Sequence, residues 1–250
     1  MEKLHSEGKC LFCEETFAKA GISRHLNTHL KSIESKNTKG KSFHIRVEAA
    51  EMFLNIWVDG KAKLIDIDDL LREIWLECCG HLSSFTDVKK RANSRNNFFG
   101  FESFLSGKFE DDESGPGEIP KKTKTQDVFY KDMIIEYEYD FGSTTQLKIK
   151  VLEEFSFRAN SDIVLLSRNE PLEILCEICH KEPAVKICSV CISQEEALFC
   201  SKCAKKHGKT CNDFDEYASM PIVNSPRMGV CGYGGGSIDV DRDGVFKKKA

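Results

Sequence analysis

The stretch FHIRVEAAEMFLNIWV, residues 43–58, decides the fold of the central part of the chain. Apolar side chains recur at every second position in both of its halves, at Phe43, Ile45 and Val47 and then at Met52, Leu54, Ile56 and Val58. Successive side chains of a β-strand point to opposite faces, so a period of two predicts a strand with one apolar face. The stretch therefore predicts two consecutive strands.

The residues that follow predict one main helix. In IDIDDLLREIWLECC, residues 65–79, apolar residues recur at helical spacing, with Asp66 as the N-cap and Gly80 as the stop. Further strands are predicted at residues 128–139, 146–155 and 162–167. The order of two strands, a helix and three strands predicts an α+β domain, with one main helix on a mixed or antiparallel sheet.

The end of this helix carries two adjacent cysteines, Cys78 and Cys79. Neighbouring residues cannot adopt the C-x2-C arrangement of metal ligands, and Cys78 lies on the apolar face of the helix. We therefore predict that Cys78 is a buried core thiol. Far along the chain, Cys231 is predicted to be a spare thiol.

Length and composition allow one medium domain with small modules attached. The chain has 250 residues, 40% of them hydrophobic and 30% charged, and a formal net charge of −4, so a nucleic-acid contact would need a local basic patch. The predicted divisions are 1–40 (a zinc finger and basic linker), 41–172 (the α+β domain), 173–215 (a two-zinc module) and 216–250 (a partly flexible tail). Residues 110–127 are predicted to form a surface loop.

Seven of the twelve cysteines lie in CEICHKEPAVKICSVCISQEEALFCSKCAKKHGKTC, residues 176–211. The N-terminus, MEKLHSEGKC, lacks the apolar core of a signal peptide, so a cytoplasmic location with reduced thiols is expected. This expectation disfavours disulfides and haem attachment to the C-x-x-C-H at 176–180. Two residues between cysteines let both thiolates reach one ion, and zinc takes four such ligands. Eight ligands predict two zinc ions: Cys176, Cys179, Cys188, Cys191, Cys200, Cys203, His207 and Cys211.

The phrase ALFCSKCAKKHGKTC, residues 197–211, resembles the B-box and related cross-brace zinc modules. The resemblance implies that the first and third cysteine pairs hold one ion, and that the second pair and the final His/Cys hold the other. The implied ligand sets are Cys176, Cys179, Cys200 and Cys203, and then Cys188, Cys191, His207 and Cys211. Four protein ligands leave no open position for catalysis, so such a module is expected to be a scaffold for protein contacts.

A third zinc site is predicted near the N-terminus. Residues 10–29, CLFCEETFAKAGISRHLNTH, have the spacing Cys10-x2-Cys13-x11-His25-x3-His29. The ββα zinc finger has this layout, with cysteines on a hairpin and histidines on a helix.

The finger is a weak candidate for reading DNA. Its base-reading positions would hold Ala18, Gly21 and Arg24, and of these only Arg24 could pair with a guanine edge. The flank is basic, which supports phosphate contact, although a solvated linker explains the same residues. The candidate nucleic-acid residues are Lys19, Arg24 and Lys31, and the basic flank comprises Lys31, Lys36, Lys39, Lys41 and Arg46.

Two motifs of the central domain, HLSSF (81–85) and EYEYDFGSTTQLKIKV (136–151), resemble the plasmid pRiA4b ORF-3-like family, whose members are also called insertion-sequence passenger "TnpR" proteins. The similarity spans roughly residues 42–168, and PIVNSPRMGVCGYGG (221–235) is similar to the tail of longer family members that carry the cysteine-rich module. The family commonly has an acidic residue, a tryptophan and a histidine where this chain has Ser143, Thr145 and Leu147. Strand and turn roles also explain the YDFG tetrapeptide.

Three functions are compatible with these features. The first is a non-catalytic zinc-containing adaptor that binds a protein or a nucleic acid. The second is a nucleic-acid-binding accessory protein of a mobile element. The third is a hydrolase-type enzyme that would need residues from distant parts of the domain to converge: His44, His81, Glu138 and Asp140. No apolar run is long enough to predict a membrane span. SIDVDRDG, residues 237–244, opens like a calcium loop but lacks the closing glutamate, so a flexible acidic tail is preferred.

Overall fold

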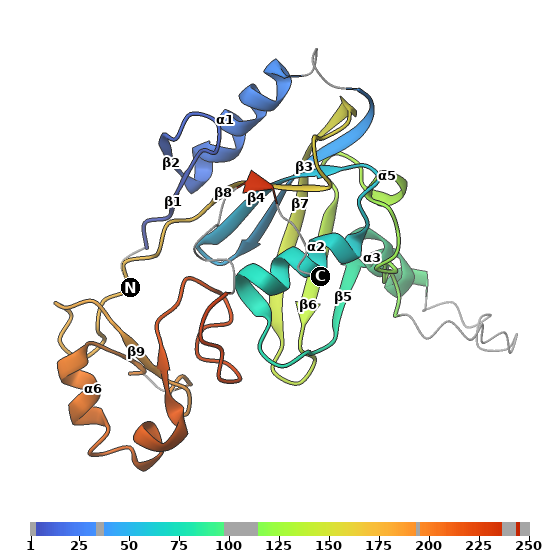
Figure 1. Cartoon of the computed structure of the whole chain (residues 1–250). Coiled ribbons are helices and arrows are strands. Elements are labelled where there is room, and N and C mark those ends of the chain that lie inside the picture. Colours follow the sequence, from blue (N-terminus) through green and yellow to red (C-terminus); the bar gives the residue numbers. More distant parts are fainter. Residues whose placement is uncertain (1–3, 34–37, 98–114, 194–195, 237–243, 246–250) are drawn as a thin grey trace, which may run out of the picture.

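A computed structural model describes residues 4–33, 38–97, 115–193, 196–236 and 244–245 (Figure 1). Its centre is a seven-stranded sheet in the order β12-β8-β4-β3-β7-β6-β5, in which every neighbouring pair is antiparallel. The strands are β3 (Lys39–Ala49), β4 (Met52–Asp59), β5 (Ser83–Asp87), β6 (Ile134–Tyr139), β7 (Thr145–Phe157), β8 (Ile163–Arg168) and β12 (Gly244–Val245). The predicted pair at 43–58 is the hairpin of β3 and β4, and the α+β class is confirmed.

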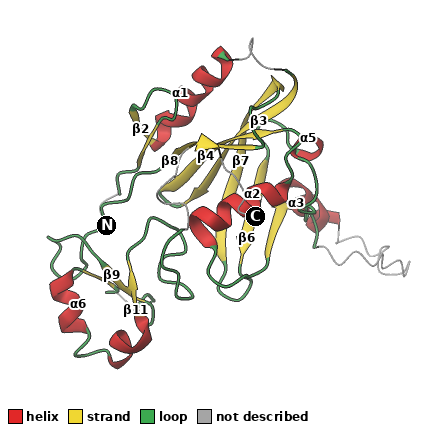
Figure 2. Ribbon diagram, in the orientation of Figure 1, coloured by secondary structure: helices red, strands yellow, loops and turns green. Residues whose placement is uncertain are grey.

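One face of the sheet is covered by the predicted helix (Figure 2). Helix α2 (Leu64–Leu71) continues into a π-helical turn, η2 (Arg72–Leu76), and short helices α3 (Val88–Asn97) and α5 (Thr125–Val128) follow elsewhere. The apolar side of α2 and η2 packs on the alternating residues of the strands, and together they form the main core. The predicted start of the helix is slightly late. Asp66, the predicted N-cap, is instead the third helical residue, and its carboxylate accepts a hydrogen bond from the Lys63 N–H at 2.7 Å.

The opposite face of the sheet is covered by the N-terminal finger. Strands β1 (Glu7–Lys9) and β2 (Thr16–Ala18) form a hairpin, and helix α1 (Lys19–Ser32) follows. Ile22, Leu26 and Leu30 of α1 are buried against a second apolar cluster that includes Phe53 and Trp57 of β4. Fully burying such a side chain contributes about 1.5–3 kcal/mol, so the finger is part of the folded body.

A buried polar network fixes the finger helix on the sheet. The His44 ring lies with Nδ1 2.6 Å from Asn27 Oδ1 of α1 and Nε2 3.0 Å from Asn55 Oδ1 of β4. The Ser23 hydroxyl of α1 donates to the same Asn55 oxygen at 2.7 Å. Burial lowers the pKa of His44 to about 4, so the ring is neutral at physiological pH.

The C-terminal module has its own small sheet, in the order β10-β9-β11. Its elements are β9 (Lys186–Cys188), β10 (Leu198–Phe199), helix α6 (Ser201–His207), a π-helical turn η3 (Phe214–Ala218) and β11 (Ser219–Pro221). Because β11 pairs with β9, the module extends past the predicted boundary at residue 215. The chain then returns to the central domain, as Figure 1 shows.

The structure refines two predictions about irregular segments. The strand predicted at 128–139 begins only at Ile134, because residues 125–128 form α5 and a turn with Asp132 at a positive φ of 64° precedes the strand. Within the tail that is predicted to be partly flexible, residues 222–236 contain well-packed side chains, since Ser225, Arg227 and Tyr233 are 2% exposed or less. The calcium-like stretch up to residue 243, residues 110–114 of the predicted loop, and Lys36 lie outside the described residues. Within the described ranges, no helix has the length and apolar character needed to cross a membrane.

Candidate metal centres

The finger brings its four predicted ligands together. Cys10, Cys13, His25 and His29 each offer a ligand atom, and all four atoms lie within 4.8 Å of one another. Cys13 Sγ lies 3.2 Å from His25 Nε2, which lies 3.1 Å from His29 Nε2. The cysteines come from the loop after β1, and the histidines come from successive turns of α1. The His25 ring stacks on the Phe17 ring, with 3.9 Å between the ring centroids. This group could hold one metal ion.

The C-terminal module contains two interleaved groups of four ligands. One group is Cys176, Cys179, Cys200 and Cys203, and the other is Cys188, Cys191, His207 and Cys211. These are the two ligand sets that the resemblance to B-box modules implies. In each group the ligand atoms lie within 4.8 Å of one another. The two groups could therefore hold two ions that tie the short β-strands to α6.

Crowding and burial shift the pKa values of several of these thiols. Burial and the neighbouring thiol of Cys188 raise the pKa of Cys191 to about 12. Burial and the thiols around it also raise the pKa of Cys203 to about 12. At Cys176 burial acts in the same direction, but backbone hydrogen bonds from Cys200 and Cys179 outweigh it and lower the pKa to about 6. A divalent cation would stabilise the thiolates and displace their protons, so metal binding by such groups depends on pH.

The sequence did not reveal a fourth group. Cys78, Cys79, His81 and Cys231 also place their ligand atoms within 4.8 Å of one another. The prediction that Cys78 is a buried core thiol is therefore wrong in part: its side chain packs at the edge of the main core, but its Sγ lies 3.6 Å from Cys79 Sγ. Cys231, predicted to be a spare thiol, lies 3.6 Å from Cys79 Sγ across 152 positions of sequence.

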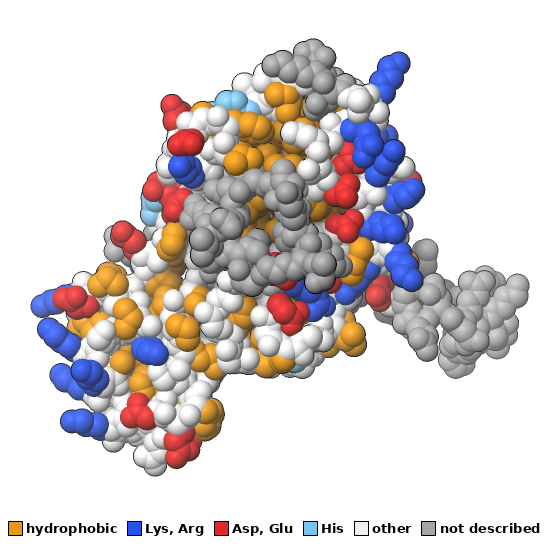
Figure 3. Space-filling model, in the orientation of Figure 1, with side chains coloured by type: hydrophobic (Ala, Val, Ile, Leu, Met, Phe, Trp, Pro, Cys, Tyr) orange, Lys and Arg blue, Asp and Glu red, His pale blue; other side chains and the backbone are white. Residues whose placement is uncertain are grey.

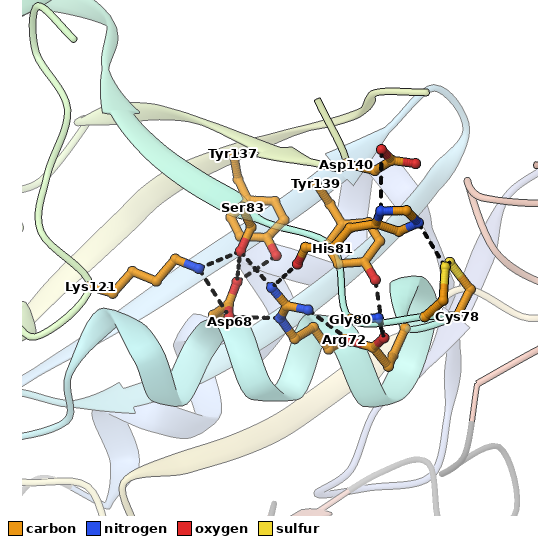
Figure 4. Close-up of polar contacts among 12 residues, drawn as sticks. Asp68, Arg72, Cys78, Gly80, His81, Ser83, Lys121, Tyr137, Tyr139 and Asp140 are labelled. Carbon is orange, nitrogen blue, oxygen red and sulfur yellow. Dashed lines mark hydrogen bonds and ion pairs between the residues drawn. The ribbon is translucent and has the colours of Figure 1, made fainter. Parts of the chain in front are cut away.

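A network of polar side chains holds the loop that carries three of these residues (Figure 4). The Arg72 guanidinium donates to the His81 carbonyl oxygen and to Glu77 Oε2, both at 2.7 Å. The other Glu77 oxygen accepts hydrogen bonds from the Gly80 N–H at 2.5 Å and the Tyr139 hydroxyl at 3.2 Å. The loop between η2 and β5 is thus anchored to the helix at one end and to β6 at the other.

The same network continues into the buried end of α2. Asp68, which is 2% exposed, accepts hydrogen bonds from Arg72, Ser83 and Tyr137 at 2.6–2.8 Å. Lys121 lies 3.5 Å from this carboxylate. These donors hold the pKa of Asp68 below its usual range, although burial alone would raise it. The charged carboxylate of Asp68 therefore binds the Arg72 guanidinium and fixes its position.

The returning segment is fixed by a second buried cation, Arg227. This side chain is fully buried and donates to Asp140 Oδ2 at 2.6 Å, to the Ser143 carbonyl at 3.1 Å and to Thr145 Oγ1 at 3.0 Å. The hydrogen bond from Arg227 lowers the pKa of Asp140. Asp140 is the aspartate of the YDFG tetrapeptide, so it holds the returning segment as well as ending a strand. Phe141, in contrast, is 55% exposed and does not continue the strand.

The residues proposed for nucleic-acid contact are spread over the finger helix. Arg24 and Lys31 are exposed, and Lys31 pairs with Glu153 at 3.7 Å. Lys19 is bound to the Ala50 carbonyl oxygen and lies 3.7 Å from Glu48. Two flanking residues also face carboxylates of the sheet: Lys41 with Glu154 at 2.7 Å and Arg46 with Glu48 at 3.1 Å. Much of the basic flank is therefore neutralised by acidic groups of the same chain.

The residues considered for catalysis converge only in part. His81 Nδ1 lies 3.5 Å from Asp140 Oδ1. His44 is buried under α1, and Glu138 is occupied on β6 by a hydrogen bond from the Gln146 amide at 2.9 Å. His81 and Asp140 therefore lie next to each other, but the other nitrogen of His81 faces thiols. His81 Nε2 lies 2.9 Å from Cys79 Sγ and 3.5 Å from Cys231 Sγ.

Comparison with known proteins adds little to this geometry. No protein-family model matches the chain, and no curated protein matches it. Among solved structures, the crystal structure of a protein of unknown function from Methanosarcina mazei Go1 is similar over 51% of this chain and 68% of that chain, with 15% sequence identity and a TM-score of 0.35. The function must therefore be argued from the residues themselves.

Proposed function

We propose that the protein is a non-catalytic, zinc-stabilised adaptor that binds another protein through its C-terminal module. Each of the three predicted metal groups has four ligands from the chain, and zinc sites closed in this way stabilise folds. Zinc is the metal that fits sites built from cysteine thiolates, alone or together with imidazoles. We therefore propose three zinc ions, one in the finger and two in the C-terminal module.

The observation that carries this proposal is the distribution of exposed apolar side chains. Among the described residues, five of the ten large apolar side chains that are exposed fall between residues 175 and 217. They are Leu175, Ile178, Val185, Ile192 and Tyr217, with exposed fractions of 42–62%. Figure 3 shows apolar side chains on this module, with lysines along one edge. A concentration of this kind is typical of a surface that contacts another protein.

The chemistry of the surface indicates the kind of partner. Val185 lines an open hollow of about 520 Å³ together with Phe214, Lys186, Lys205 and Asp215. Helix α6 and the residues just after it add exposed lysines: Lys202, Lys205, Lys206 and Lys209. A protein segment with an apolar anchor for the hollow and acidic residues beside it would complement this surface.

The proposal is tested by affinity capture with the zinc-loaded chain from a lysate of the source cell, followed by quantitative mass spectrometry. Val185→Glu places a carboxylate in the hollow, and Tyr130→Glu, at a side chain 40% exposed on the central domain, is the matched control. We expect a protein that is captured by the wild type and by Y130E, and lost by at least about tenfold with V185E. Equal capture by all three chains would contradict a role of this surface.

The nucleic-acid alternative is tested in the same preparation by fluorescence anisotropy with duplex DNA and single-stranded RNA. Salt-sensitive binding that disappears with Arg24→Ala and Lys31→Ala would favour an accessory protein of a mobile element instead. The resemblance of residues 42–168 to the pRiA4b ORF-3-like family, and a cytoplasmic location, remain predictions.

A further inference from the structure

We propose that Cys78, Cys79, His81 and Cys231 bind a fourth zinc ion, which fastens residues 222–236 to the central domain. This site is separate from the adaptor surface and does not depend on the proposed function. Its ligands come from two places: the loop between η2 and β5, and the segment after the C-terminal module. The ion would close a connection across 150 residues of sequence between His81 and Cys231.

Three of the four short distances between ligand atoms in this group match those of a tetrahedral zinc site. Zinc bonds of about 2.3 Å to sulfur and about 2.0–2.1 Å to nitrogen place two sulfurs about 3.8 Å apart and a sulfur about 3.5 Å from a nitrogen. Here Cys79 Sγ lies 3.6 Å from both Cys78 Sγ and Cys231 Sγ, and Cys231 Sγ lies 3.5 Å from His81 Nε2. The contact from Cys79 Sγ to His81 Nε2 is shorter, at 2.9 Å.

The other metal groups of the chain show similar spacings. The ligand atoms of Cys13 and His25 are 3.2 Å apart, those of Cys191 and His207 are 3.7 Å apart, and those of Cys179 and Cys200 are 3.9 Å apart. The fourth group thus has the arrangement of the three groups that the sequence itself predicts. With it, all twelve cysteines of the chain belong to one of the four groups.

The surroundings of His81 are those of a histidine that binds a metal. Its Nδ1 faces the Asp140 carboxylate at 3.5 Å, while Nε2 faces the thiols (Figure 4). Histidine ligands of metals commonly donate their second N–H to a carboxylate, which fixes the orientation and the tautomer of the ring. Asp140 is itself held by Arg227, so the carboxylate and the segment carrying Cys231 are positioned together.

Two rival interpretations explain less of this geometry. A disulfide would join two of the three thiols and leave the third thiol and His81 without a role, and the 3.6 Å separations exceed the roughly 2.0 Å of an S–S bond. A Cys-His-Asp catalytic arrangement of Cys79, His81 and Asp140 needs a single thiol. Three thiols converge on this imidazole, and zinc coordination uses all of them.

The fourth ion is accessible to solvent. Cys79 and Cys231 are exposed, whereas the cysteines of the other three groups are buried or partly buried. A chelator should therefore remove this ion first, and the segment 222–236 should loosen from the domain as it leaves. The central sheet and the C-terminal module retain their own cores and should stay folded.

The test is native mass spectrometry of the full zinc-loaded chain and of single variants. We expect four zinc ions in the wild type, three in Cys231→Ser and in Cys79→Ser, and four in Leu82→Ser, an exposed neighbour of His81 that serves as the control. Three ions in the wild type would overturn the proposal, as would four ions in C231S or, after the metal has been removed, a mass lower by two hydrogen atoms, which marks a disulfide.

A second measurement on the wild type covers the case in which a variant fails to fold. Intact protein is alkylated with iodoacetamide before and after a chelator has removed one ion per chain. Cys78, Cys79 and Cys231 should be protected in the fully loaded protein and should be the cysteines alkylated after the first ion leaves. Alkylation of these three thiols at full zinc load, or first alkylation in another group, would overturn the assignment.

Discussion

Replacing His44 with asparagine should change how the stability of the protein depends on pH. The His44 ring is fully buried between α1 and the sheet, where its two nitrogens face the side-chain amides of Asn27 and Asn55. Burial lowers its pKa to about 4, the Asn55 contact opposes this shift, Arg46 adds to it and Glu153 reduces it. Asparagine keeps a polar side chain at this position but cannot take up a proton.

The sign and size of the effect follow from the two pKa values. His44 titrates near its ordinary value of 6.5 in the unfolded chain and near 4 in the folded chain, so between these pH values the unfolded chain binds the proton more tightly. The stability that the neutral ring contributes above pH 6.5 is lost as the pH falls towards 4. Between pH 7.5 and pH 5.5 the wild type should lose about 1 kcal/mol that the variant does not lose.

The assay is urea unfolding of the wild type and H44N at both pH values, followed by tryptophan fluorescence. Trp57 lies in the apolar cluster under α1 and Trp75 lies in the main core, so the emission reports the docking of the finger together with the unfolding of the central domain. Acid also weakens zinc binding, but the two chains share the same predicted metal ligands, so this loss cancels in the difference between them. A stability difference that stays constant between pH 7.5 and 5.5 would refute the argument that His44 is buried in its neutral form.

Other perturbations test separate parts of the structure. Leu26→Ala should lower the free energy of unfolding by about 2–5 kcal/mol, because it leaves a cavity between the finger and the sheet, whereas exposed Thr28→Ala should change it little; equal effects in urea titrations would contradict the docked finger. Cys200→Ser should release one zinc ion and increase hydrogen exchange in residues 173–221 while the central sheet stays protected, and an unchanged metal count would contradict the ligand set. Asp140→Asn should raise hydrogen exchange in residues 222–236, because it removes the carboxylate bound by Arg227; unchanged protection there would show that other contacts hold the segment.

Local patterns predicted the parts of the molecule in which neighbouring residues act together. The alternation in residues 43–58 predicted β3 and β4, and the spacing of cysteines and histidines predicted the three groups that the structure brings together in the finger and the C-terminal module. The docking of the finger was missed, although the same stretch contains Phe53 and Trp57 on its other face. Alternation shows that a face is apolar, but it does not show which element covers that face.

The fourth group was missed for a related reason. Its ligands lie on two segments that only the folded chain brings together, and Cys78 and Cys79 lack the spacing by which zinc sites are found in sequences. The sequence did contain two features that, taken together, could have indicated this group. They are the Cys-Cys-x-His sequence at 78–81 and one distant cysteine, Cys231, without an assigned role. The ion pair of Asp140 with Arg227 had no such signal, because a contact between the residue after β6 and a late loop has no local sequence pattern.

Elemental analysis tests most directly whether the four Cys/His groups hold zinc. The full chain is purified without added metal and without chelators, and its metals are measured against protein concentration determined by amino-acid analysis. Four zinc ions per chain are expected in the wild type and three in C231S, with other metals present only in traces. One zinc ion per chain or fewer, or iron in place of zinc, would contradict the interpretation of these groups as structural zinc sites.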